Sequence, residues 1–315
     1  MRPLVSIIIP TYNRSHLIGE TLDSVINQTY SHWECIVVDD RSDDYTEELI
    51  NFYRKKDPRI KLFQRPEELS KGAAGCRNIG IRNSIGDFIQ FLDSDDLLSK
   101  SCLENRIQFI INYPRNNLWV FKTANFHTGS VPQLFNTLPN LQNEKDFYLK
   151  SFLDGSYPFT VISTIWKKQY LRELNGFDTE FLLLEDPVLH VKSLLADGKI
   201  VTDIEGKIDT FYRTNNVSKR DQIQIWKYQL KFAKKYKNEF RNYNSAYFYK
   251  IIKSLFCDDF SFKYFKKTLS LGVKTRNISL LFFFKSMFFS LYYISKLNHK
   301  RYIGFNTVRK LVLKK

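Results

Sequence analysis

Phe88-Ile-Gln-Phe-Leu-Asp-Ser-Asp-Asp96 is an apolar run that ends in three carboxylates within four residues. The apolar part follows Gly86 and is short, which is typical of a strand buried on both faces of a parallel sheet that has helices on either side. The acidic part would then stand at the carboxyl end of that strand. In open α/β sheets this edge is where ligands bind.

The acidic part of this stretch has two interpretations. Carboxylate oxygens are the ligands that hard cations such as Mg²⁺ and Mn²⁺ prefer, so Asp93 and Asp95 would hold a metal beside a phosphate-bearing substrate. Alternatively, the acids open the following helix, because Asp is favoured near a helix N-terminus. This stretch alone does not decide between them.

The chain before this stretch alternates between strand and helix patterns. Strands are predicted over 5–10, 33–38 and 60–64, and helices over 17–26, 44–56 and 73–83. This alternation predicts an α/β fold with a Rossmann-like parallel sheet, helices on both faces and right-handed crossovers. Proline cannot donate to a ladder, so Pro10 is expected to end the first strand.

Polar residues follow three of the predicted strands, and the ends of parallel strands meet at one edge of a sheet. The three polar groups are therefore expected to form one site: Thr11-Tyr12-Asn13, Asp39-Asp40 and Asp93 to Asp96. Neither Gly-x-Gly-x-x-Gly nor Gly-x-x-x-x-Gly-Lys-Ser/Thr occurs in the sequence. A nicotinamide enzyme and a P-loop nucleotidase are therefore not favoured.

Composition indicates a globular protein of one large or two smaller domains, since 43% of the 315 residues are hydrophobic. The four cysteines have no metal-type spacing, and no signal segment precedes the first predicted strand. We therefore expect reduced thiols in a cytoplasmic protein.

The net charge of +15 is unevenly distributed along the chain. Residues 1–219 carry 26 Lys and Arg against 29 Asp and Glu, whereas residues 220–315 carry 22 against 4. The second segment also holds 23 of the 49 aromatic residues. The chain changes character near Lys219, so we expect one part over 1–219, followed by a basic, aromatic-rich helical tail over 220–315. Such asymmetry points to an anionic partner, either membrane or nucleic acid.

Four pieces of the sequence, in their order and spacing, resemble glycosyltransferase family 2, the inverting sugar transferases with the GT-A fold, of the bacterial cell-surface polysaccharide type. The pieces are Val5-Ser-Ile-Ile-Ile-Pro-Thr-Tyr-Asn13, Val37-Val-Asp-Asp40 with Ser42, Gly75-Cys-Arg-Asn78 with Gly80, and Phe91-Leu-Asp-Ser-Asp-Asp96. Cys76 departs from the alanine usual in that position. The resemblance covers about two thirds of the chain. It implies a GT-A glycosyltransferase domain over 1–219, with a nucleotide-binding half (1–100) and an acceptor half (101–219).

The resemblance implies roles for residues at the predicted edge. Asp95 would be the direct ligand of Mn²⁺ or Mg²⁺ in a DxD motif, with Asp93 near the ribose or the metal. Asp40 would accept a hydrogen bond from the N3–H of uracil. The remaining nucleotide-sugar-binding residues would be Pro10, Thr11, Tyr12 and Arg77.

Each of these residues also has a purely structural interpretation. Asp39 and Asp40 would cap a turn, Arg77 would pair with a surface acid, and Tyr12 would pack in the core. Asp96 is interpreted as structural, at the start of the helix that contains Leu103, Ile107 and Ile110.

The acceptor half carries Asn175-Gly-Phe-Asp178 and then Phe181-Leu-Leu-Leu-Glu-Asp186. By resemblance, Asp186 is the catalytic base that takes the proton from the acceptor hydroxyl, with Glu185 as its substitute. Alternatively, Pro187 occupies the first helical position and Asp186 is the N-cap, which would lower its basicity.

The segment Phe211-Tyr-Arg-Thr-Asn-Asn-Val-Ser218 resembles the closing segment of the family, although the histidine common there is absent. Arg213, Asn215 and Ser218 would meet the diphosphate. The alternative is a polar loop after an edge strand.

In the tail, the apolar run 278–294 would form a helix about 25 Å long, short of the roughly 30 Å hydrocarbon core of a bilayer. A helix lying in the membrane interface is expected instead, with basic residues toward anionic headgroups. These residues are Lys296, Lys300, Arg301, Arg309, Lys310, Lys314 and Lys315. Packing of the tail on protein, with solvated lysines, is the alternative, and no nucleic acid is expected as a partner.

The sequence therefore predicts a metal-dependent inverting glycosyltransferase of the hexosyltransferase class. It would move a sugar from a UDP-sugar to a hydroxyl of a glycan or lipid-linked glycan, and would lie peripherally on the inner face of the cell membrane. The competing hypothesis is a catalytically inactive relative that acts as a membrane-associated or nucleic-acid-binding scaffold.

Overall fold

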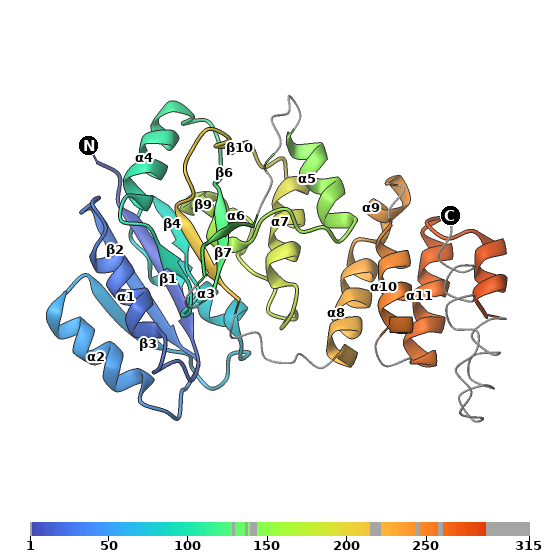
Figure 1. Cartoon of the computed structure of the whole chain (residues 1–315), viewed down its shortest axis with the longest axis horizontal. Helices are drawn as coiled ribbons and strands as arrows, with labels where there is room; N and C mark the ends of the chain where they lie inside the picture. Colours follow the sequence, from blue (N-terminus) through green and yellow to red (C-terminus); the bar gives the residue numbers. More distant parts are fainter. Residues whose placement is uncertain are drawn as a thin grey trace. The chain divides into compact units, whose positions relative to one another are not determined.

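The computed structural model describes residues 2–127, 130–135, 138, 144–214, 222–243, 246–257 and 261–287 (Figure 1). The chain divides into two compact units. The first comprises Met1–Leu149 and Tyr157–Ser218, and the second comprises Lys150–Ser156 and Lys219–Lys315.

The first unit is built on a seven-stranded sheet with the order β10-β6-β9-β4-β1-β2-β3. Its parallel part consists of β1 (Val5–Thr11), β2 (Trp33–Asp39), β3 (Ile60–Gln64) and β4 (Phe88–Phe91). The connecting helices are α1 (Ile18–Ile26), α2 (Thr46–Lys56) and α3 (Ala73–Asn83). The predicted strand–helix alternation over the first hundred residues is confirmed.

The sheet is not parallel throughout. Strand β9 (Thr164–Lys167) runs antiparallel to both β4 and β6 (Leu118–Val120), and β10 (Ile200–Thr202) is parallel to β6. The prediction of a parallel sheet, made for the strands of the first hundred residues, is confirmed for β1 to β4. Among the described strands of this sheet, β9 alone runs in the opposite direction.

Pro10 does not end β1, because the strand continues to Thr11, which pairs with Asp39. The carbonyl of Ile8 accepts a hydrogen bond from the N–H of Leu92, directly after β4. The backbone polar groups of every second residue point to the same neighbouring strand, so those of Pro10 also point toward β4. The pairing of β1 with β4 stops at Ile8 and Phe91. The missing N–H of Pro10 therefore falls where the ladder with β4 has already ended.

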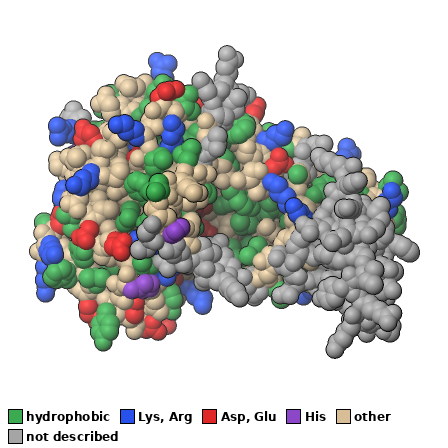
Figure 2. Space-filling view, viewed as in Figure 1, with side chains coloured by type: hydrophobic (Ala, Val, Ile, Leu, Met, Phe, Trp, Pro, Cys, Tyr) green, Lys and Arg blue, Asp and Glu red, His purple; other side chains and the backbone are tan. Residues whose placement is uncertain are grey.

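The remaining elements of the first unit include a smaller sheet with the order β5-β11-β7-β8. Its strands are β5 (Leu97–Leu98), β7 (Thr123–Phe126), β8 (Gln133–Leu134) and β11 (Thr210–Arg213). The helices are α4 (Cys102–Asn112), α5 (Glu144–Leu153), the 3₁₀ turn η1 (Val161–Ser163), α6 (Lys168–Glu173) and α7 (Glu185–Leu195). From Lys150 onward, α5 belongs to the second unit. Acidic and basic side chains are interspersed on the face of this unit drawn in Figure 2.

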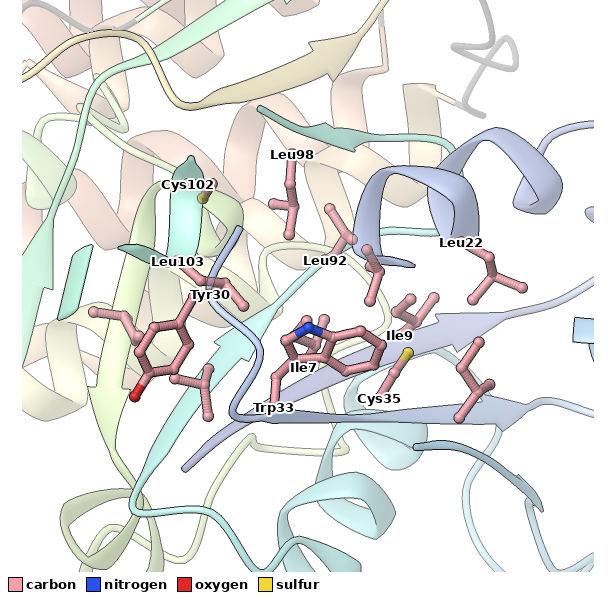
Figure 3. Close-up of a cluster of buried hydrophobic side chains, with 14 of the residues drawn as sticks. Ile7, Ile9, Leu22, Tyr30, Trp33, Cys35, Leu92, Leu98, Cys102 and Leu103 are labelled. Atoms are coloured by element: carbon pink, nitrogen blue, oxygen red, sulfur yellow. The ribbon is translucent and has the colours of Figure 1, made fainter. Parts of the chain in front are cut away.

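The main core lies between the sheet and helices α1 and α4 (Figure 3), where Ile7, Ile9 and Leu22 pack with Trp33. Side chains alternate along a strand, so Ile36 and Val38 of β2 face the other side of the sheet, where they pack against α3. A Cβ on Gly80 of α3 would lie 2.3 Å from the Ile8 side chain, so glycine allows α3 to approach β1 closely. Both faces of the central strands are therefore buried, as the apolar pattern predicted.

The second unit is helical, as expected for the tail. Its helices are α8 (Gln222–Lys235), α9 (Lys237–Asn242), α10 (Tyr247–Cys257) and α11 (Phe262–Lys274). Many of its aromatic residues form its own core, among them Trp226, Phe232, Phe240, Tyr247, Phe248 and Phe265. No helix within the described ranges is long and apolar enough to cross a membrane. The basic cluster from Lys296 to Lys315 and the apolar run beyond Met287 lie outside the described residues.

Candidate functional site

The loops after β1, β2 and β4 meet at the carboxyl edge of the sheet. The backbone N–H of Asn13 donates to Ser42 Oγ at 2.9 Å, and the N–H of Asp40 donates to the Thr11 carbonyl at 2.8 Å. Pro10 and Thr11 are buried within β1, whereas Tyr12 is 53% exposed. The interpretation of Tyr12 as core packing is therefore wrong, and its ring is available to a ligand.

Asp40 is tied to the segment that precedes α3. One of its carboxylate oxygens accepts from the N–H of Gly72 at 2.7 Å, and the other pairs with the buried guanidinium of Arg65. Asp39 is buried and accepts from the Ser42 N–H at 3.1 Å, so it does cap a turn. Each carboxylate oxygen has a second lone pair, and Asp40 can thus accept one more hydrogen bond.

Arg77 on α3 lies at the centre of the site and is only 2% exposed. Its guanidinium bonds Asp93 Oδ1 at 2.7 Å, Asp186 Oδ1 at 3.2 Å and Glu185 Oε1 at 3.4 Å. Burial lowers the pKa of Arg77, but the three carboxylates raise it further, so its pKa lies above the usual value. Arg77 is thus not a surface residue paired with a single acid, because it links the loop after β4 to the start of α7.

The Asn175–Asp178 motif supports Arg77 from the opposite side. Asn78 Oδ1 accepts from the Phe177 N–H at 2.8 Å, and Asn78 Nδ2 donates to the Phe177 carbonyl at 2.9 Å. The Phe177 ring then lies 5.2 Å from the Arg77 guanidinium. A Cβ on Gly176 would come within 2.2 Å of Asn78 Oδ1, which explains the glycine.

Asp186 is the second residue of α7 and not its N-cap, because the helix begins at Glu185 after Leu184, whose φ is 66°. Pro187 is correspondingly the third helical residue. Asp186 Oδ2 accepts from the Val161 N–H at 3.3 Å. Burial, followed by the neighbouring Glu185 and Asp93, raises the pKa of Asp186 to about 7 despite Arg77, which lowers it. A carboxylate that titrates near neutral pH suits a general base.

The acidic loop after β4 carries two partly exposed carboxylates. The side chains of Asp93 and Asp95 are 32% and 21% exposed. Burial and the charge of Asp93 raise the pKa of Asp95, although Arg14 Nη2 lies 3.8 Å from its Oδ2 and lowers it. Arg14 was not predicted as a site residue; its position in the turn directly after Thr11-Tyr12-Asn13 was the available signal.

Asp96 is structural, as interpreted, but it does not begin a helix. Strand β5 follows it, and α4 begins only at Cys102. The fully buried Asp96 accepts from the Arg213 N–H at 2.8 Å, joining the acidic loop to β11. Burial and the adjacent acids raise the pKa of Asp96 well above its ordinary value.

Arg213 supports the acidic loop from within the protein. Its Nε donates to the Asp95 carbonyl at 2.8 Å, and its Nη2 pairs with Glu20 at 2.6 Å. Its guanidinium also stacks on Phe126 at 4.6 Å. Arg213 therefore holds the Asp95 backbone, and its contact with the diphosphate stays a prediction. Asn215 and Ser218 lie outside the described residues.

The donor set of the acidic loop fits a divalent cation that arrives with a phosphate substrate. Among the described residues, no cluster of three or more His, Cys, Asp or Glu is arranged to hold a metal by itself. Mg²⁺ is usually bound by one or two carboxylates together with substrate phosphates. Asp93 and Asp95 supply such a pair.

The sheet order, the acidic loop after β4 and the second carboxylate pair opposite it define a protein of the GT-A class. Solved structures with this fold include Staphylococcus aureus TarS in complex with UDP-GlcNAc, with a TM-score of 0.65 and 19% identity over 87% of this chain and 81% of that one. The mannosyltransferase PcManGT from Pyrobaculum calidifontis, in complex with GDP-Man and Mn²⁺, covers 99% and 84% at a TM-score of 0.52 and 17% identity. At these identities the likeness concerns the fold alone.

The chain belongs to glycosyl transferase family 2: residues 6–162 match the model of that family. The Escherichia coli protein named UDP-Glc:alpha-D-GlcNAc-diphosphoundecaprenol beta-1,3-glucosyltransferase WfgD is 44% identical over 219 residues, which are 68% of this chain and 79% of WfgD. A Haemophilus influenzae glycosyltransferase is 42% identical over 109 residues, 35% of this chain. The chain spans 43% of that relative's length and 23% of a Rickettsia conorii glycosyltransferase.

Proposed function

We propose that the chain is a metal-dependent, inverting glycosyltransferase that moves a hexose from a UDP-sugar to a hydroxyl of a glycan or lipid-linked glycan in surface polysaccharide synthesis. The observation that carries this proposal is the arrangement around Arg77. That guanidinium binds Asp93 of the acidic loop on one side and Asp186 of α7 on the other, at 2.7 and 3.2 Å. The acidic loop, where the donor would bind, and the proposed base therefore contact the same guanidinium.

The donor assignment is supported by the relatives and by the base pocket. The name of WfgD specifies UDP-Glc, and TarS was solved with UDP-GlcNAc. In this chain the exposed ring of Tyr12 would stack on uracil, above Pro10 and Thr11. The remaining acceptor capacity of Asp40 would receive the uracil N3–H, a hydrogen bond that cytosine cannot donate.

Metal dependence is supported by the two carboxylates of the acidic loop. Asp95 would ligate the ion directly, with Asp93 beside it, while Arg213 holds the Asp95 backbone in place. Bound Mn²⁺ or Mg²⁺ would offset the charge of the departing diphosphate. The neighbour PcManGT carries Mn²⁺, which agrees with this assignment.

Asp186 would act as the base in a single displacement. The acceptor oxygen forms a bond to C1 of the donor sugar, the bond from C1 to the diphosphate oxygen breaks, and the acceptor proton passes to Asp186. The attack occurs opposite the leaving UDP, so the configuration at C1 inverts. Arg77 fixes the orientation of Asp186, and Glu185, which also bonds Arg77, would be the substitute base.

Association with the inner face of the cell membrane is also proposed, since a lipid-linked acceptor lies there. The described aromatic residues of the second unit are largely used in its core. Membrane contact would therefore fall to exposed apolar side chains such as Leu280, Leu281 and Phe284, and to the basic cluster beyond Met287. Deletion of 276–315, which removes both the exposed apolar side chains and the basic cluster, should release the protein from anionic vesicles in a flotation assay; full retention would contradict this placement.

Calorimetric titration of UDP into the full chain, with Mn²⁺ and then with a chelator, tests the core of the proposal. We expect binding that requires the metal and that Asp95→Asn abolishes. Loss of turnover in Asp95→Asn and Asp186→Asn would exclude the inactive scaffold, which has no need of either carboxylate. No UDP binding under either condition would contradict the donor assignment.

A further inference from the structure

The second unit contains a groove between α8 and α11 that is lined mainly by lysines. The groove has a volume of about 980 Å³, and eight of its twelve lining residues are lysines. Lys227, Lys231 and Lys234 recur on one face of α8, and Lys263, Lys267 and Lys274 recur on one face of α11. Side chains three, four or seven residues apart share a helix face, so both helices place lysines along the same groove. The accessible lining is mostly apolar, which indicates that the lysine stems form the walls.

The walls of this lysine groove are held by a packed core. The rings of Trp226 on α8 and Tyr264 on α11 lie 6.1 Å apart. Phe232 and Phe265 are fully buried on the same two helices. The lysines are therefore mounted on a packed pair of helices and do not depend on a loop for their positions.

Acidic side chains of the described part of the second unit do not line the groove, although Lys231 has an interaction of its own and does not count toward the unbalanced charge. That part contains two acidic residues, Asp154 and Glu239, and neither lines the groove. Like charges at helical spacing repel one another, so a row of lysines on each wall is unfavourable for the helices themselves. An anionic ligand would remove this repulsion.

The shape of the groove indicates which anion it fits. With a rise of about 1.5 Å per residue, the stretch from Lys227 to Lys234 of α8 is about 10 Å long and its lysines recur about every 4.5–6 Å. A linear chain with one charged group per repeating unit matches such a row. A flat bilayer matches it less well, because interfacial binding uses an apolar face that dips into the membrane. Proteins that bind single-stranded nucleic acid stack its bases on a series of aromatic rings, and the lining has one aromatic residue, Tyr264.

We propose that the lysine groove binds an anionic glycan, a linear chain with carboxylate or phosphate groups along it, and so retains a growing acidic polymer on the enzyme. This inference deepens the proposed function and rests on it for the identification of the polyanion as a glycan. Lysine ammonium groups are hydrated point charges, and the binding is therefore multivalent and weakened by salt.

The test measures binding of fluorescent oligogalacturonate, a carboxylate polymer, to the full chain by anisotropy at low and physiological salt. The groove variant carries Lys227→Gln, Lys234→Gln and Lys267→Gln, all at exposed positions. The matched control carries Lys253→Gln, Arg276→Gln and Lys285→Gln, which remove the same charge from exposed positions that do not line the groove. Circular dichroism checks that both variants fold.

We expect the groove variant to lose affinity for oligogalacturonate by about tenfold or more, since several charge contacts disappear, while the control stays close to the parent. Neutral dextran oligosaccharide should not bind. Equal losses in both variants would overturn the inference. Groove-dependent binding of phosphatidylglycerol vesicles or of oligo(dT) in place of oligogalacturonate would overturn it in favour of a membrane or nucleic-acid surface.

The UDP titration separates this inference from the proposed function. Metal-dependent UDP binding without oligogalacturonate binding would contradict the anionic-glycan site and support the proposed transferase function. Groove-dependent oligogalacturonate binding without UDP binding would support the polyanion site and contradict the assignment of a UDP-sugar as donor.

Discussion

Arg77 and Asp186, which are 109 residues apart in the sequence, are joined by a hydrogen bond of 3.2 Å at the carboxyl edge of the sheet. The same guanidinium holds Asp93 at 2.7 Å. One buried cation therefore sets the distance between the acidic loop and the start of α7, the two places where a donor diphosphate and a base would act.

Replacing Arg77 by lysine should reduce turnover strongly. Lysine keeps the charge but lacks the planar fork that reaches three carboxylates at once. We expect kcat to fall about 10²-fold or more, because misplaced catalytic groups cost this much. Steady-state kinetics measure it, and Arg82→Lys, at an exposed position on the same helix, is the control. Parent-like kinetics for Arg77→Lys would contradict a positioning role.

Asp186→Asn should reduce kcat by about 10²–10⁴-fold, the range that a general base contributes. UDP affinity should be unchanged, since the base faces the acceptor. Glu185→Gln is the matched control, because it removes the adjacent carboxylate from the same Arg77. A larger loss in Glu185→Gln than in Asp186→Asn would identify Glu185 as the base.

Activity should depend on pH through Asp186, whose pKa is raised to about 7 chiefly by burial. A base acts in its ionised form, so kcat/KM should rise as pH increases through about 7. The free energy of unfolding should change in the opposite direction with pH. A raised folded pKa stabilises the protein below the ordinary Asp pKa, and this contribution is lost as pH rises through about 7.

Paired thermal unfolding curves check the stability sign. Asn at position 186 does not ionise, so the variant avoids the loss of stability that the parent undergoes as pH rises. The melting temperature of Asp186→Asn minus that of the parent should therefore be larger at pH 8 than at pH 5, values that bracket the pKa of about 7. A shift in the other direction would show that Arg77 stabilises the ionised carboxylate more than burial destabilises it.

Tyr12→Ala should weaken UDP binding without affecting the fold, because the ring is 53% exposed. Stacking of a base on an aromatic side chain contributes about 1–3 kcal/mol, which corresponds to a loss of affinity of about 5-fold to 150-fold. Calorimetric titration with UDP measures the loss, with the exposed Tyr45→Ala as control. Equal affinity in the parent and Tyr12→Ala would place the base elsewhere.

Asn78→Ala should destabilise the first unit. It removes both hydrogen bonds to the Phe177 backbone, at 2.8 and 2.9 Å, and with them the support behind Arg77. An unsatisfied buried polar group costs about 1–3 kcal/mol. Denaturant unfolding measures the change, and Asn83→Ala, which loses one bond to the Ile79 carbonyl on an exposed part of α3, should cost clearly less. An equal loss of unfolding free energy in both variants would contradict the supporting role of the two Asn78 hydrogen bonds.

Local pattern was sufficient for much of the first hundred residues. The predicted bounds of β3 at Ile60–Gln64 and of α3 at Ala73–Asn83 agree with the structure, because both were read from residues within the segment itself. Local pattern was not sufficient where the bounds of a strand or the role of a residue depend on a segment far away in the sequence. The continuation of β1 past Pro10 follows from the early end of β4, and the role of Asp96 follows from the Arg213 N–H, 117 residues away.

The sequence by itself determined the fold class, the family and the three polar loops at one edge, because strand periodicity and motif order are local properties of the chain. Tertiary structure alone decided that Arg77 binds three carboxylates, that Arg213 supports the acidic loop, and that the pKa of Asp186 lies near 7. These properties arise from burial and from charges that distant segments bring together, and neither can be read from neighbouring residues.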